Sequence, residues 1–424
     1  MAESNSLRRN TLWMISGHGI SLLFQAAYFI LIGRTLGSHE YGAFVGVAAL
    51  INVLSQFSSL GMEMILVRNI SRARESFAVT WGNALRISIC GFVVLLGLAM
   101  LVGHFTLKHE LQRLIPYVAL SDALLGKIVQ LASRAFQGAG MLVQTARLTA
   151  FTNIARAVSA LGLFFFAASV HFHADALLWT RIYWISSLVT AGLAFGSVTR
   201  RLGWPRFGRI SMRDMTEGFS FSLSSSSISV YNDIDKTFLA GVGQLYAAGI
   251  YSAAYRVIDV ASIPIYALYT AATPQFFREG EGGVANACAI AKRLLRPTVP
   301  YGILIAMGLF ACASVLPYIF GASFQESVEA LRWLCLLPLI RVLHYAWGTT
   351  ITGSSSQWYR TATQLGAAGS NLLLNMVLIP HWSWRGAAIA SLLTDAGLAV
   401  ASWMVVRHLS AGKSSQKIVA TQAA

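Results

Sequence analysis

Long apolar runs recur along almost the whole of this 424-residue chain, and they constrain its fold more than any other feature. Each run is about 20 residues long, the length at which an α-helix crosses the hydrocarbon core of a bilayer. Hydrophobic residues make up 55% of the chain and charged residues 12%, about half the charged fraction of a typical soluble protein. One soluble core cannot bury that much apolar surface, so the sequence predicts an all-α integral membrane protein.

We predict twelve transmembrane helices and divide them at the one sizeable boundary, the arginine-rich stretch 199–217. The spans before it are 12–33, 42–64, 82–103, 114–137, 148–170 and 176–198, and those after it are 218–241, 247–272, 298–319, 328–351, 361–380 and 386–407. The predicted parts are therefore a cytoplasmic N-terminus at 1–11, an N-lobe at 12–198, a basic cytoplasmic linker at 199–217, a C-lobe at 218–407 and a cytoplasmic tail at 408–424.

The cations are distributed unevenly over the predicted loops. The chain has 32 Lys and Arg against 17 Asp and Glu, a formal net charge of +15. With the N-terminus in the cytoplasm, most of the loop cations lie on the cytoplasmic side, as the positive-inside rule requires. The charge pattern thus predicts a multi-pass protein of the inner (plasma) membrane with both termini in the cytoplasm. Because so few residues are charged overall, it argues against a nucleic-acid partner.

No motif for a cofactor, a metal or catalysis is recognisable. The four cysteines lack a CxxC spacing and are interpreted as small core residues. Gly412-Lys413-Ser414 lacks the upstream glycine of a phosphate-binding loop, so no ATPase is supported. We therefore predict no cofactor, no metal ligand and no catalytic residue, and the chain is not expected to be an enzyme.

A short repeat suggests how the two lobes are related. Leu36-Gly37-Ser38-His39-Glu40-Tyr41-Gly42-Ala43-Phe44 follows the first span, and Val242-Gly243-Gln244-Leu245-Tyr246-Ala247-Ala248-Gly249-Ile250-Tyr251 follows the seventh. Each is a short turn bounded by glycine, followed by a helix that opens Gly-x-aromatic. With six spans per lobe, both lobes share one orientation. The expected relation is a pseudo-twofold axis along the membrane normal, as in secondary transporters with a site between the halves.

Several further motifs resemble the polysaccharide (O-antigen or lipid-linked oligosaccharide) flippases. These belong to the polysaccharide transporter family in the multidrug/oligosaccharidyl-lipid/polysaccharide (MOP) exporter superfamily. The resemblance covers nearly the whole chain in matching order. It rests on Gly33-Arg34-Thr35-Leu36-Gly37, Glu40-Tyr41-Gly42, Gly61, Val67-Arg68-Asn69-Ile70-Ser71-Arg72, Asp235-Lys236-Thr237-Phe238-Leu239, Gly249-Ile250-Tyr251-Ser252-Ala253-Ala254-Tyr255-Arg256, Pro274, Asn371 to Asn375, Leu378-Ile379-Pro380 and Arg385-Gly386-Ala387-Ala388-Ile389-Ala390.

The resemblance implies a MATE-like fold and a specific activity. Such a protein would move an isoprenoid (undecaprenyl) pyrophosphate-linked oligosaccharide from the cytoplasmic to the periplasmic leaflet by alternating access, for cell-surface polysaccharide biosynthesis. Its implied partners are the lipid-linked substrate, the lipid bilayer, and a polysaccharide polymerase and glycosyltransferases of the same pathway. Two alternatives stay open: a multidrug or organic-cation exporter of the same superfamily, and a membrane glycan polymerase or ligase.

Four cations lie deep in the predicted spans and are candidates for binding the pyrophosphate: Lys127, Arg156, Arg256 and Arg341. Ionisable groups inside a bilayer are costly and usually face a cavity or a partner, and guanidinium groups pair well with phosphate oxygens. The alternative for all four is internal salt bridging. The resemblance favours Arg256 as the ligand contact.

Polar and acidic residues in the spans complete the candidate site. Gln25, Asn52 and Gln56 form polar faces that either line a sugar cavity or hydrogen-bond between helices, and Tyr255 adjoins Arg256 in the resembling motif. Three acids are candidates for coupling to a proton or sodium ion, with structural pairing as the alternative: Glu63, Asp259 and Asp395.

Overall fold

The structure is a computed structural model that describes the backbone of residues 2–170, 172–281, 283–354 and 357–422. Side chains are described for residues 21–170, 172–280, 283–354 and 358–410. The described backbone consists of helices joined by turns and by short non-helical segments such as 203–211, without a strand. The prediction of an all-α protein is thereby confirmed.

The chain forms two compact units. Unit 1 comprises Met1–Ser229, Lys236–Gly249 and Ile319–Ser323, and unit 2 comprises Val230–Asp235, Ile250–Tyr318 and Phe324–Ala424. The predicted lobe bounds and the pseudo-twofold axis stay predictions.

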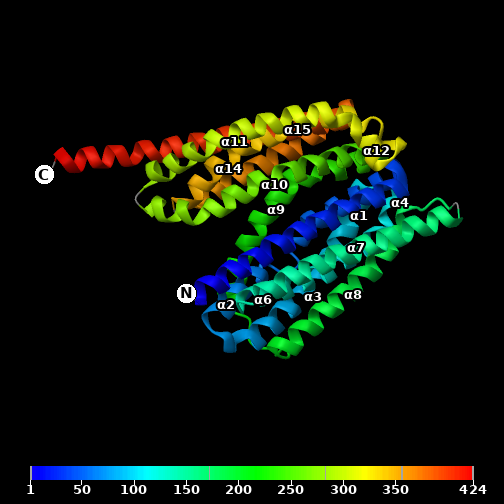
Figure 1. The fold of residues 1–424 in the computed structure, drawn as a ribbon, viewed down its shortest axis with the longest axis horizontal. Helices are drawn as coiled ribbons and strands as arrows, with labels where there is room; N and C mark the ends of the chain where they lie inside the picture. The colour runs from blue at the N-terminus through cyan, green and yellow to red at the C-terminus, as the bar shows by residue number, and fades with distance from the viewer. Residues whose placement is uncertain (1, 171, 282, 355–356, 423–424) are drawn as a thin grey trace. The chain divides into compact units, whose positions relative to one another are not determined.

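In unit 1, α1 packs along α7, and α6 contacts α2, α7 and α8 (Figure 1). The helices of this part of the chain are α1 (Ala2–Ser55), α2 (Met62–Arg72), η1 (Arg74–Ser76), α3 (Phe77–Thr106), α4 (His109–Gln112), α5 (Ile115–Ala119), the π-helical η2 (Leu120–Leu125), α6 (Gly126–Gly138), α7 (Leu142–Val170), α8 (Ala176–Leu202) and α9 (Met212–Gly241).

In unit 2, α14 packs against both α11 and α15 (Figure 1). The helices from residue 245 onward are α10 (Leu245–Glu281), α11 (Val284–Cys312), η3 (Ala313–Val315), α12 (Leu316–Phe320), η4 (Ala322–Phe324), α13 (Ser327–Leu334), α14 (Leu337–Gly353) and α15 (Gln357–Gln422).

Two of the long helices are each broken where the sequence predicts a turn between spans. In α1 the break is at Gly37, with φ 70° and ψ 171°, between the spans 12–33 and 42–64. In α15 it is at Ser383, with φ 54° and ψ −137°, between the spans 361–380 and 386–407. A positive φ is readily adopted only by glycine, so the backbone at Ser383 is strained.

The second predicted span, 42–64, differs from the structure. Its helix ends at Ser55, residues 56–61 form a turn, and α2 begins at Met62. Leu60 and Gly61 both have positive φ, and the backbone of Gly218 lies so close to Gly61 that a side chain would not fit there. Apolar content alone does not reveal this close crossing of α2 and α9.

The membrane character of the helices is visible in their surfaces. Seven segments of the described chain are long and apolar enough to cross a membrane, and one of them, Trp358–Ser410, contains the last two predicted spans. Large hydrophobic side chains such as Val94, Phe166 and Leu304 are exposed on the helix sides, where a bilayer would cover them. The predicted spans outside these seven segments lie on α1, α9 and α10. These helices are more polar, and α9, for example, contains four consecutive serines at 224–227.

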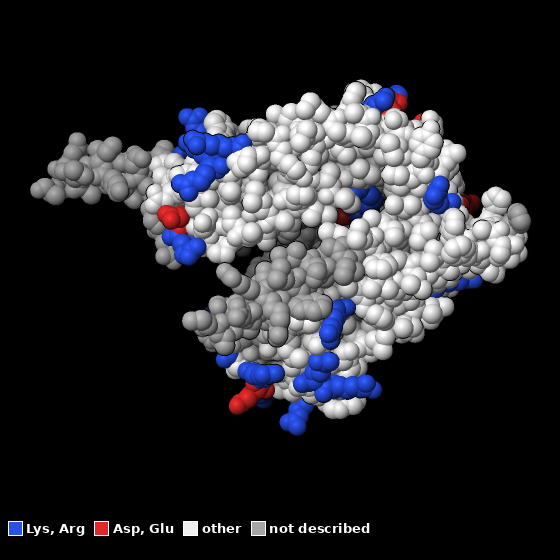
Figure 2. All heavy atoms as spheres, viewed as in Figure 1, with Lys and Arg blue, Asp and Glu red and all other residues white. Residues whose placement is uncertain are grey.

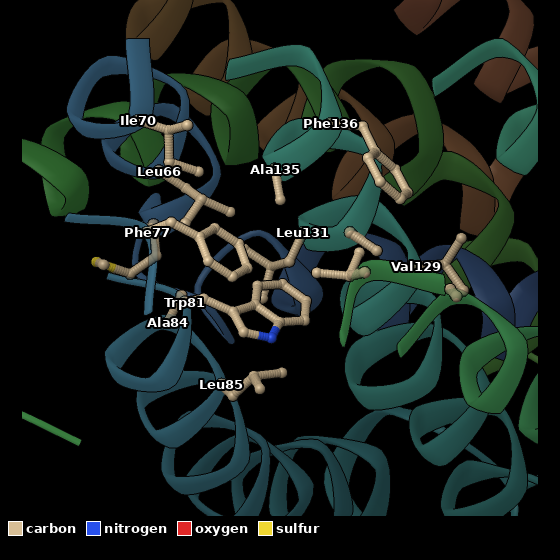
Figure 3. Close-up of a cluster of buried hydrophobic side chains, with 14 of the residues drawn as sticks. Leu66, Ile70, Phe77, Trp81, Ala84, Leu85, Val129, Leu131, Ala135 and Phe136 are labelled. Atoms are coloured by element: carbon tan, nitrogen blue, oxygen red, sulfur yellow. The ribbon is translucent and has the colours of Figure 1, made fainter. Parts of the chain in front are cut away.

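Charge is distributed as a membrane protein requires. On the face shown in Figure 2, most Lys and Arg side chains lie over the ends of helices, and the helix sides are white. The interior of unit 1 contains a hydrophobic cluster from α2, α3 and α6, centred on the fully buried Trp81 (Figure 3). The rings of Phe77 and Trp81 stack with centroids 6.3 Å apart. This cluster fixes α2 and α6, which carry the acid and the cation of a buried ion pair described below.

Candidate intramembrane charge sites

Arg341 is the centre of a charged cluster in unit 2. Its Nη1 lies 3.2 Å from Oδ1 of Asp259 on α10, and its Nε lies 3.5 Å from Oδ2 of Asp395 on α15. Its Nη2 donates a hydrogen bond of 2.7 Å to the hydroxyl of Tyr255. Arg341 has no acid nearby in sequence, and its two carboxylate partners come from other helices. Such pairing offsets much of the cost of burying the guanidinium.

Two more groups extend this cluster. Arg256 lies one helical turn before Asp259, with its Nη1 3.8 Å from the carboxylate, and Nδ1 of His344 lies 3.7 Å from Asp395. The i, i+3 spacing of Arg256 and Asp259 in the sequence predicts that their side chains are close. His344 is not among the predicted site residues. We call Arg256, Asp259, Arg341, His344 and Asp395 the unit 2 charge cluster.

A smaller cluster lies in unit 1. Nη2 of Arg156 on α7 lies 3.4 Å from Oδ1 of Asp122, and the Tyr183 hydroxyl on α8 donates a 2.5 Å hydrogen bond to the same oxygen. The guanidinium of Arg156 also lies 5.0 Å from the centroid of the Tyr183 ring. Asp122 is part of the π-helical η2, a distortion that often marks functional sites in helices. We call Asp122, Arg156 and Tyr183 the unit 1 charge cluster.

Lys127 and Glu63 form a direct ion pair in unit 1. The Lys127 Nζ lies 2.8 Å from Oε1 of Glu63, and both side chains are buried. Lys127 is five residues after Asp122, and the structure pairs the two residues with different partners. The pair ties α2 to α6.

The predicted polar face on α1 is only partly assembled. The Gln56 Nε2 donates a 3.2 Å hydrogen bond to the main-chain carbonyl of Asn52. Asn52 is exposed and Gln25 is half-buried. Asn52 and Gln56 are therefore one helical turn apart at the end of α1. Gln25 lies on the other side of the break at Gly37, in the first part of α1.

Two networks, one buried and one partly exposed, were not expected from the sequence. In unit 2 the Tyr251 hydroxyl donates a 2.5 Å hydrogen bond to Asp235 and lies 3.0 Å from the Ser391 hydroxyl. At the end of α2, Arg68 binds Asp214 and Glu217 on α9 at 2.6 Å each. The hydrogen bond to Glu217 is the largest influence raising the pKa of Arg68 above its ordinary value. No local spacing points to these partners, since both networks join distant segments.

The comparisons with known proteins agree with this architecture. Residues 7–279 match the family model described as "Polysaccharide biosynthesis protein". A protein of Escherichia coli (strain K12) named "Putative O-antigen transporter" is 23% identical over 419 residues, covering 95% of this chain and 97% of that protein.

Solved structures with the same fold include two kinds of transporter. An inward-facing multidrug resistance MATE family transporter of the MOP superfamily has a TM-score of 0.74 and 16% identity, with 95% of this chain and 99% of that chain covered. The lipid II flippase MurJ in an inward closed conformation has a TM-score of 0.70 and 10% identity, with 93% and 87% covered.

The family model covers well over half of the chain, and the structural likeness extends over almost all of it. Together with the apolar helices, these matches confirm a multi-pass membrane protein with the predicted twelve-helix, two-lobe, MATE-like fold. This chain belongs to the polysaccharide biosynthesis protein family.

Proposed function

We propose that this protein is a flippase that moves an isoprenoid (undecaprenyl) pyrophosphate-linked oligosaccharide from the cytoplasmic to the periplasmic leaflet of the inner membrane. The family match, the name of the Escherichia coli relative and the fold shared with the lipid II flippase support this activity. Both termini lie in the cytoplasm in this proposal. The polymerase and glycosyltransferases of the same pathway supply and consume the glycan.

The observation that carries the proposal is the neutralisation of acids in the helices. An exporter of organic cations needs a carboxylate that a cationic drug can pair with. In the described part of the chain, several carboxylates in the helices already have a basic partner within 4 Å. Among them are Glu63, Asp122, Asp259 and Asp395. This arrangement favours an anionic or polar cargo.

The exposure of the four deep cations divides them by role. The side chains of Arg256 and Arg156 are 32% and 25% exposed, so they can reach a diphosphate. Those of Arg341 and Lys127 are both 6% exposed. We assign binding of the pyrophosphate to Arg256 and Arg156, and positioning of the carboxylates to Arg341 and Lys127.

The remaining predicted residues contribute polar contacts in this scheme. Gln25, Asn52 and Gln56 present amide groups, which both donate to and accept from sugar hydroxyls. Tyr255 is buried and accepts the Arg341 hydrogen bond, so it orients the guanidinium of Arg341 and stays out of reach of the glycan.

Coupling to an ion is assigned to Asp259, with Asp395 and Glu63 as buried alternatives. Asp259 has the most accessible of the three carboxylates and two arginine partners. A proton or sodium ion on it would release Arg256 toward the diphosphate, because that cation would lose a competing anion. Alternating access then exposes the loaded site to the opposite leaflet.

The membrane potential helps an anionic cargo to leave a negative cytoplasm. Each unit charge gains about 2.3 kcal/mol per 100 mV, so a diphosphate with about two negative charges gains roughly 4.6 kcal/mol. That gain makes ATP unnecessary on thermodynamic grounds.

Reconstitution tests the proposal. Purified protein in proteoliposomes would be given a fluorescent lipid-diphosphate saccharide, and its flipping would be followed with a membrane-impermeant quencher. We expect flipping by the wild type and at least a tenfold slower rate for Arg256→Gln, since a hydrogen bond to a charged group contributes about 1.5–3 kcal/mol. Arg385→Gln, which removes an exposed arginine paired with Glu329, is the matched control. Transport of organic cations without flipping would overturn the proposal.

A further inference from the structure

A cavity of about 400 Å³, lined largely by polar residues, lies between α6 and α7 in unit 1, separate from both charge clusters. Its volume is within the usual range of small-molecule sites. Gln130, Arg134 and Gln137 line it from α6, and a row of threonines lines it from α7. Neither the sequence motifs nor the proposed function assigns this cavity a ligand.

Arg134 gives the cavity its charge. This half-buried side chain donates a 2.7 Å hydrogen bond from Nη1 to Oε1 of Gln137, and Gln137 is neutral. Among the side chains that the structure describes, no carboxylate lies within ion-pair distance of Arg134, in contrast to Arg156, Arg341 and Lys127. A guanidinium has five N–H donors in a planar fork, so most of its donors are available to an anion.

The opposite wall offers acceptors. Thr145, Thr149 and Thr152 follow the i, i+4, i+7 spacing that places them on one face of α7, and all three line the cavity. Thr149 and Thr152 each donate their hydroxyl proton to a carbonyl one turn earlier in α7, and Thr145 donates to the Ser133 carbonyl of α6. Their oxygens therefore face a ligand as acceptors.

The cavity thus has a cationic donor wall and a row of hydroxyl acceptors that extends over about 10 Å of helix. A phosphate alone would engage only the donors of the α6 wall, which are Arg134 and the glutamine amides, and not the threonine acceptors. A phosphorylated sugar would engage both walls, since its phosphate accepts from the guanidinium and its hydroxyls donate to the threonine oxygens. We propose that this cavity binds the diphosphate-sugar end of the lipid-linked oligosaccharide when the substrate first enters from the cytoplasmic leaflet. This inference rests on the proposed function and assigns it an entry site.

An anionic phospholipid with a polyol headgroup, such as phosphatidylglycerol, has the same chemistry and is the competing source. The test measures the Kd of a short-chain polyprenyl diphosphate monosaccharide for the full chain in phosphatidylcholine nanodiscs. We expect Arg134→Gln to raise this Kd at least tenfold and Thr149→Val to raise it several-fold. Arg147→Gln, which removes an exposed arginine of the same helix as Thr149, should leave it within twofold. Phosphatidylglycerol added to the nanodiscs should not displace the probe.

The outcomes separate this inference from the proposed function. Wild-type flipping in proteoliposomes together with an unchanged Kd for both Arg134→Gln and Thr149→Val would refute the entry site alone. Displacement of the probe by phosphatidylglycerol at equal mole fraction would assign the cavity to phospholipid and also refute the inference. A wild type that neither binds the probe nor flips it would overturn both proposals. Size-exclusion profiles of each variant identify any that fail to fold, and Thr149→Val, which keeps the side-chain shape, then carries the test.

Discussion

Replacing Lys127 with methionine would leave the carboxylate of Glu63 buried without its cation. The two atoms of this ion pair lie 2.8 Å apart, and both side chains are buried. Removing one partner of a buried ion pair costs about 3–5 kcal/mol, whereas replacing both by apolar residues is often neutral or stabilising. We therefore expect Lys127→Met to lower the free energy of unfolding by about 3–5 kcal/mol. The double variant Glu63→Leu/Lys127→Met should recover most of that loss.

The assay is reversible unfolding in mixed detergent micelles for the wild type, both single variants and the double variant. Lys292→Met removes an exposed lysine and should change the free energy of unfolding by no more than about 0.5 kcal/mol. Because Lys127 acts through Glu63 in our scheme, the double variant should also retain flipping. If the two single losses simply add in the double variant, within about 0.5 kcal/mol, the two side chains are not energetically coupled and our reasoning is wrong. If the stable double variant fails to flip, Lys127 or Glu63 acts in transport itself, and the assignment of Lys127 to positioning alone is wrong.

Three further substitutions test other contacts. Tyr183→Phe removes the hydroxyl that donates to Asp122, and we expect a loss of about 1–3 kcal/mol in the same unfolding assay; an unchanged stability would contradict the unit 1 charge cluster. Gly42→Ala places a methyl group against the backbone of Leu245, so its yield of folded protein on size exclusion should fall, and a normal yield would show that the helices are farther apart. Arg341→Lys keeps the charge but loses the planar guanidinium, which reaches two carboxylates and a hydroxyl. Flipping should therefore slow at least tenfold, and a wild-type rate would refute this role of Arg341.

Part of the candidate site is within reach of sequence reasoning. The spacing of Arg256 and Asp259 predicts their contact, because residues three apart share a helix face, and the structure has it. The same rule applied to Thr145, Thr149 and Thr152 would have identified the polar wall of the α6–α7 cavity. The sequence shows Arg134 only as a cation near the end of the predicted span 114–137, since sequence does not show whether a carboxylate lies near it.

The sequence by itself determined the membrane class, the placement of most spans and the family. These follow from local properties: the length of apolar runs and the order of short motifs along the chain. It placed the turns near Gly37 and Ser383 in the right gaps, but it missed the turn at 56–61, which depends on the close approach of Gly218 to Gly61.

Only the tertiary structure decided which charges neutralise one another. Arg156 pairs with Asp122, 34 residues away along the chain, and Arg341 with Asp259, 82 residues away. Such partners depend on how each helix is rotated about its axis and which neighbour it packs against, and neither quantity is encoded in a local pattern. For the same reason, Arg134 could be recognised as a cation facing a polar cavity only after α6 and α7 were packed together.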